Sequence, residues 1–176
     1  MFLNKKIKSQ IEVPYFFFTG KFENINSDYF INKIKKGIEE TNNLNFKTNV
    51  KGHMTDWKYF KNDIELWKLL WPIFDLVEKE VKLDQFELFD AWGHCLGMGG
   101  STTFHKHSPS LFSGAIYLND HSQELQFPEI NESLKPEKGS FAVFSSLLKH
   151  GCPRNSEMNI KWGLSFNCIQ KADSFK

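Results

Sequence analysis

The sequence predicts a mainly β protein with helices at its N-terminal end. From about residue 85 the hydrophobic pattern has a period of two, in short runs separated by turn-forming segments. Many short strands at regular spacing are typical of an antiparallel barrel or jelly roll. A chain of 176 residues is the size of one domain. We therefore expect a single domain over 1–176, with N-terminal helical support over about 1–84 and a jelly-roll core over about 85–170.

Two stretches before residue 85 have the pattern of amphipathic helices. In the first, residues 26–44, Asn26 or Ser27 can cap the start. Its apolar residues at helical spacing are Phe30, Ile31, Ile34 and Ile38. In the second, residues 62–82, Pro72 is expected to kink or divide the helix. Its apolar stripe comprises Leu66, Leu70, Ile73 and Val77.

The remaining chain predicts strands. They are the runs FELFDAW, TTFHKH, SGAIYLN, LQFPEI, SFAVFSS and KWGLSFNCI. GMGG, NDHSQ, KPEKG and CPRNSEMN separate them as turns. GMGG lacks the following helix of a phosphate loop, so we interpret it as a strand connection.

Composition excludes some partners and favours one compartment. Lysine and arginine total 22 against 21 acidic residues, which is not the basic excess of a non-specific nucleic-acid binder. The cysteines are Cys95, Cys152 and Cys168, an odd number without paired spacing, which favours a reducing cytoplasm. No run approaches the roughly 18 apolar residues of a membrane span, and lysines interrupt the N-terminal stretch. We expect a soluble cytoplasmic protein.

Two histidines one residue apart are the first candidate site. Alternation along TTFHKH puts His105 and His107 on one face of a strand. Two neutral imidazoles that face the same way suit iron, zinc or copper. For the pair alone, hydrogen-bonded or surface histidines are an open alternative.

A third histidine and a lysine follow downstream. An apolar strand runs into His150, which alone could cap a strand in the core. Lys161 comes 11 residues later, inside the apolar run KWGLSFNCI. A lysine buried there needs an anion, whereas a lysine at a strand end can extend to solvent.

The order HKH, AIYLN, GSFAVFSSLLKH and IKW resembles the iron(II) and 2-oxoglutarate dependent oxygenases, whose core is a double-stranded β-helix (jelly roll, cupin-like). TNVKGHMTDW and AWGHCLGMGGSTTFHKH are similar to a prolyl-4-hydroxylase-like branch found in marine bacteria and phages. The resemblance implies a hydroxylase acting on a protein side chain or a small molecule. The implied iron ligands are His105, His107 and His150. Lys161 would pair with the distal carboxylate of 2-oxoglutarate, with Tyr117 and Ser165 as further donors.

Two positions depart from the family pattern. His107 replaces the usual carboxylate ligand, so the iron would be one unit more positive than with the common ligand set. Asp120 is the nearest candidate for a recruited carboxylate, although its strand parity opposes that of Tyr117. Gly163 stands where many relatives carry a serine. His94 and Cys95 point to opposite faces of one strand, and we interpret both as structural.

Two other functions compete with this interpretation. In a three-histidine, cupin-like dioxygenase the substrate would chelate the iron directly and no 2-oxoglutarate would be used; Lys161 argues against this alternative. A non-enzymatic jelly-roll binding module would carry the histidines incidentally and would purify without stoichiometric iron.

Overall fold

The computed structural model describes residues 15–41, 48–83 and 85–171. Within these ranges the helices are α1 (Ser27–Thr41) and α2 (Ile64–Val81). The strands are β1 (Phe17–Lys21), β2 (Val50–Lys51), β3 (His53–Met54), β4 (Phe86–Leu96), β5 (Ser101–His105), β6 (Phe112–Tyr117), β7 (Leu125–Phe127), β8 (Glu132–Leu134), β9 (Ser140–Ser145), β10 (His150–Cys152) and β11 (Lys161–Gln170). The described chain is therefore mainly β, with both helices before the long strands.

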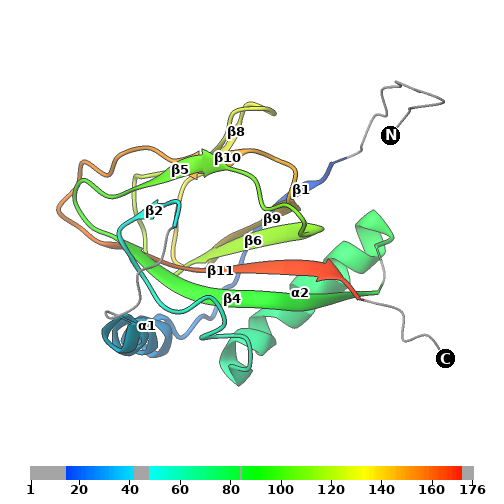
Figure 1. Cartoon of the computed structure of the whole chain (residues 1–176), viewed down its shortest axis with the longest axis horizontal. Helices are drawn as coiled ribbons and strands as arrows, with labels where there is room; N and C mark the ends of the chain where they lie inside the picture. The colour runs from blue at the N-terminus through cyan, green and yellow to red at the C-terminus, as the bar shows by residue number, and fades with distance from the viewer. Residues whose placement is uncertain (1–14, 42–47, 84, 172–176) are drawn as a thin grey trace, which may run out of the picture.

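The strands form two antiparallel sheets in separate layers. The larger sheet has the order β1-β9-β6-β11-β4-β3 and the smaller one β2-β5-β10-β7-β8. Figure 1 shows β5 and β10 of the smaller sheet above β4, β6 and β11 of the larger one, with α1 and α2 beneath the larger sheet. This arrangement agrees with the predicted jelly roll. One face of the larger sheet is thus covered by helices, and the other faces the smaller sheet.

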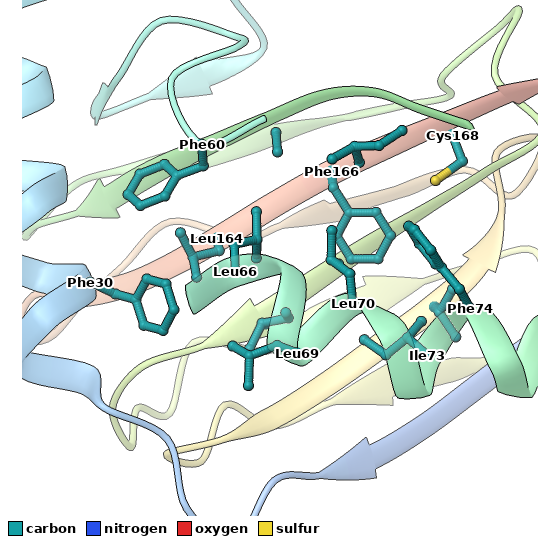
Figure 2. Close-up of a cluster of buried hydrophobic side chains, with 14 of the residues drawn as sticks. Phe30, Phe60, Leu66, Leu69, Leu70, Ile73, Phe74, Leu164, Phe166 and Cys168 are labelled. Atoms are coloured by element: carbon teal, nitrogen blue, oxygen red, sulfur yellow. The ribbon is translucent and has the colours of Figure 1, made fainter. Parts of the chain in front are cut away.

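Helix α2 packs its apolar stripe against the larger sheet. Figure 2 shows Leu66 and Leu70 near Leu164 and Phe166 of β11, and Ile73 belongs to the same buried cluster. Alternation along β11 sends Leu164 and Phe166 to this helix-covered side. The helix continues through Pro72, so Pro72 does not divide it, and the alternative that Pro72 kinks the helix stays a prediction.

One carboxylate connects the two helices. Asp63 is the N-cap of α2 and accepts a hydrogen bond from the Leu66 amide at 2.8 Å. The Tyr29 hydroxyl of α1 donates to the same side chain at 2.7 Å, and Lys33 forms an ion pair with it. At the start of α1, Asn26 accepts a hydrogen bond from the Tyr29 amide at 3.2 Å. Residues 42–44 of the predicted first helix lie outside the described residues.

Every strand run predicted after residue 85 is found, but the prediction was incomplete. β1 pairs with β9 over five residues, and β2 and β3 pair with β5 and β4. The predicted helical support over about 1–84 therefore also contributes strands to both sheets. β8 and β10, of three residues each, were not predicted either. No helix within the described ranges is long and apolar enough to cross a membrane, and the N-terminal stretch 1–14 lies outside them.

Candidate metal centre and adjoining pocket

Pairing of β5 with β10 brings the three predicted histidines together. His105 ends β5, His150 begins β10, and these two residues are register partners. His107 lies beyond the end of β5, where its amide donates to the Ser146 carbonyl at 3.0 Å. One ligand nitrogen from each histidine lies within 4.8 Å of the other two. The three imidazoles thus surround one point, although His107 reaches it from a loop and not from the predicted strand.

Backbone carbonyls orient two of these rings. The Nδ1 atom of His105 lies 2.7 Å from the Thr103 carbonyl oxygen, and Nδ1 of His150 lies 2.9 Å from that of Leu148. Because a carbonyl oxygen only accepts, each Nδ1 carries the hydrogen and donates it. The lone pair is then on Nε2, as in many histidine metal ligands.

Burial keeps the histidines neutral. Removal from water lowers the pKa of His107 to about 3 and that of His150 to about 4, and it also lowers the pKa of His105. Phe144 and Phe127 pack beside His150, with ring centroids 4.6 and 5.7 Å from that of its imidazole. Three neutral imidazoles form a donor set that fits a borderline transition metal.

A cavity of about 190 Å³ adjoins the three histidines. Side chains from both sheets line it, including Cys152 of β10 and Tyr117, Ser165 and His94 of the larger sheet. A more open groove of about 430 Å³ shares only His107 of the three histidines. Trp57, Phe89, Asp90 and Pro109 line this groove. The histidine group therefore has a deep pocket on one side and an open groove at His107.

Lys161 lies behind the wall of the deep pocket. Its side chain is fully buried, so the alternative that it extends to solvent is wrong. The ammonium donates to the Gln123 carbonyl oxygen at 3.1 Å and contacts Cys152 Sγ at 3.2 Å. It also lies 5.5 Å from the centre of the Tyr117 ring, and burial lowers its pKa. No carboxylate of the described residues forms an ion pair with this lysine, so its charge lacks a counterion there.

Paired residues of three neighbouring strands of the larger sheet, β4, β11 and β6, form the floor of the pocket. In one row, Gly163 of β11 pairs with His94 of β4 and with Tyr117 of β6. In the next row Ser165 pairs with Trp92, and Ser165 Oγ lies 3.4 Å from Nδ1 of His94. The predicted side chains Tyr117 and Ser165 therefore both reach the pocket.

His94 is a pocket residue to which the sequence analysis gave no role in a site. It was interpreted as structural, yet it lines the cavity, and burial lowers its pKa to about 3. The strand alternation that separated it from Cys95 was correct, but it does not tell which face is the pocket. The available indication was the glycine opposite, Gly163, since a residue without a side chain leaves room for a partner's ring.

Asp120 does not join the histidines. Its Oδ1 accepts a hydrogen bond from the Lys138 amide at 2.7 Å, and the metal-ligating group found among the described residues does not include it. The site as described is therefore a group of three imidazoles.

Comparison with known proteins identifies the fold. No family model and no curated protein matches the chain. Among solved structures, a prolyl-4-hydroxylase from Pseudomonas putida superposes with a TM-score of 0.67 at 14% identity, covering 89% of this chain and 93% of the other. A viral collagen prolyl hydroxylase from Paramecium bursaria Chlorella virus-1, in complex with 2-oxoglutarate, gives 0.66 at 17% identity, with 88% and 94% covered.

A third structure extends the comparison beyond prolyl hydroxylases. HygX from Streptomyces hygroscopicus, with nickel, 2-oxoglutarate and hygromycin B bound, superposes with a TM-score of 0.62 at 10% identity, covering 92% of this chain and 83% of the other. The protein therefore has the fold of the 2-oxoglutarate and Fe(II) dependent oxygenases.

Proposed function

We propose that this protein is an Fe(II)- and 2-oxoglutarate-dependent dioxygenase that hydroxylates a substrate. The observation that carries the proposal is the convergence of His105, His107 and His150 beside a pocket whose wall hides the unpaired charge of Lys161. A dicarboxylate that chelates a metal with one end would place its other carboxylate within this pocket. The shared fold is consistent with that use of the site.

The roles proposed for the residues follow from their positions. His105, His107 and His150 would hold the iron through nitrogen atoms that carry no positive charge at neutral pH. Iron bound there would supply dioxygen activation coupled to the oxidative decarboxylation of 2-oxoglutarate. Lys161 would balance the distal carboxylate, with Tyr117 and Ser165 as hydrogen-bond donors from the pocket floor. Phe127 and Phe144 would shield the His150 side of the centre from water.

The substrate would enter by the open groove at His107. This groove adjoins the deep pocket at Trp57, His107 and Ser108, so it meets the histidine group, which is where a substrate must approach the metal. The solved structures with this fold include a prolyl hydroxylase bound to a hypoxia-inducible-factor peptide fragment and HygX bound to hygromycin B. We propose accordingly that the substrate is a protein side chain or a small molecule. Free, buried cysteines at 95, 152 and 168 support a reducing cytoplasm as its location.

Anaerobic titration tests the proposal. Fe(II) and 2-oxoglutarate are added to the metal-free protein while the visible charge-transfer absorption of the Fe(II)–2-oxo acid chelate is followed. The expected result is an absorption band that requires both components and weakens in the Lys161→Ala variant. Iron binding without a band would overturn the 2-oxoglutarate assignment and favour a three-histidine dioxygenase. Absence of iron binding would overturn the enzyme and leave a binding module.

A further inference from the structure

His94 lines the deep pocket with an imidazole that the proposed function has not used. We propose that His94 binds the cosubstrate, donating a hydrogen bond from its imidazole to the distal carboxylate of 2-oxoglutarate. The proposal rests on the function proposed above, because it assigns a further residue to the same pocket. It also accounts for the absence of a side chain at Gly163.

The ring of His94 lies over the backbone of β11. A Cβ atom added to Gly163 would be 2.8 Å from Nε2 and 2.9 Å from Cε1 of this imidazole, closer than real Cβ contacts come. Gly163 is also the direct register partner of His94. On β11 the residue two positions before is Lys161, and the residue two positions after is Ser165. The imidazole therefore occupies the position on the pocket floor between Lys161 and Ser165, where a longer residue at 163 would project.

The hydrogen-bond partner of His94 determines which of its ring nitrogens can donate a hydrogen bond to a ligand. Burial keeps the ring neutral, so it has one N–H donor and one bare nitrogen. Ser165 Oγ is 3.4 Å from Nδ1, and its hydroxyl can donate to that nitrogen. In that tautomer the ring hydrogen is on Nε2, the atom that lies over Gly163. No hydrogen bond to Nε2 is formed by the described residues, so this donor is free for a ligand.

The position of Lys161 makes such a donor necessary. Its ammonium contacts Cys152 and the Gln123 carbonyl and does not itself line the cavity. It supplies positive charge from behind the wall, and a carboxylate inside needs hydrogen bonds from residues that do line it. Two carboxylate oxygens can accept about four hydrogen bonds. His94 and Tyr117 flank Gly163 in one row of the sheet, so both can reach the same carboxylate.

The first test distinguishes the hydrogen-bond donor of His94 from the space that its ring fills. His94→Phe keeps a planar ring and removes both nitrogens. We expect its affinity for 2-oxoglutarate, measured by calorimetry on the Zn(II)-loaded protein, to fall about 10- to 100-fold, the range for a hydrogen bond to a charged group. The affinity of the variant for Zn(II) alone should match that of the wild type, since His94 is outside the histidine group. Equal 2-oxoglutarate affinity in variant and wild type would overturn the role of His94 and leave the proposed function standing.

If His94→Phe does not fold, a second pair of variants tests the same donor role. His94→Ala opens the space above residue 163, and His94→Ala/Gly163→Ser fills it with a hydroxyl donor. The double variant should bind 2-oxoglutarate more tightly than His94→Ala, whereas Gly163→Ser alone should bind it more weakly than the wild type because the serine displaces the imidazole. Equal affinities of the double variant and His94→Ala would overturn the donor role. A wild-type protein that binds metal but not 2-oxoglutarate would overturn both this inference and the proposed cosubstrate.

Discussion

The Nε2 atoms of His105 and His107 lie 3.1 Å apart. Two nitrogen ligands that bind one metal ion at about 2.1 Å have a similar separation, so both atoms can bind the same ion. His105 donates its Nδ1 hydrogen to the Thr103 carbonyl, which leaves its Nε2 without a hydrogen. For Nε2 of His107 to bind a metal ion, this ring would also carry its hydrogen on Nδ1, and its charge would be unchanged.

Metal binding should accordingly release almost no protons at pH 7. All three histidines have lowered pKa values and are neutral before the metal arrives. Calorimetric titration of Zn(II) in buffers with different ionisation enthalpies measures the number of protons released. We expect a value near zero at pH 7. Release of about one proton or more would show that a histidine is charged in the metal-free protein and would contradict the burial argument.

The same burial should make the metal-free protein sensitive to mild acid. An unfolded histidine takes up a proton near pH 6.5, whereas His107 and His150 in the folded protein do so only near pH 3 and 4. Between pH 7 and 5 the unfolded state therefore binds more protons, and the free energy of unfolding falls by about 2 kcal/mol for each of these residues. Urea unfolding at both pH values should show a smaller fall in His107→Phe than in the wild type. An equal fall would mean that His107 titrates normally in the folded state.

The local sequence pattern was sufficient to predict the long strands and the order of the site residues along the chain. Alternation along KWGLSFNCI correctly placed Leu164 and Phe166 opposite to Lys161 and Ser165, because a strand between a helical layer and a pocket has two different faces. Burial of Lys161 followed from the same pattern.

Features created by tertiary pairing were not predictable in this way. β2 and β3 have two residues each and exist only because β5 and β4 offer partners. His107 reaches the metal group by a backbone hydrogen bond to Ser146 beyond the strand end, not by alternation. The position of His94 became meaningful only when the register across β4, β11 and β6 set it beside Gly163. Such relationships depend on which strands become neighbours, and a single strand does not contain that information.

Asp90 should limit stability at neutral pH. It is 92% buried, its Oδ1 has no hydrogen-bond partner among the described residues, and burial raises its pKa to about 6. The folded state therefore resists loss of the proton, and stability is lost as the pH rises from 3.8 through 6. Asp90→Asn should raise the free energy of unfolding by up to about 3 kcal/mol at pH 8 and by less than half of that at pH 4.5.

The matched control for Asp90 is an exposed carboxylate. Asp75 lies on the exposed side of α2, and Asp75→Asn should change the free energy of unfolding by no more than about 0.5 kcal/mol at either pH. Denaturant unfolding of both variants at pH 4.5 and 8 measures the difference. A gain of equal size in the two variants would indicate a general charge effect and would contradict the specific cost of burying Asp90.

A substitution at Lys161 should change the affinity for 2-oxoglutarate without lowering the free energy of unfolding. Lys161→Met keeps a long flexible chain and removes an ammonium group that is fully buried without a carboxylate partner among the described residues. Because a buried charge costs free energy that an apolar isostere does not, unfolding of the metal-free variant should require at least as much free energy as unfolding of the wild type. The affinity of the Zn(II)-loaded variant for 2-oxoglutarate should fall about 10- to 100-fold, since the charge opposite the distal carboxylate is lost. The exposed Lys149 serves as the control, and Lys149→Met should leave the affinity unchanged. Unchanged affinity in Lys161→Met would show that the buried lysine is only structural and that the distal carboxylate is held elsewhere.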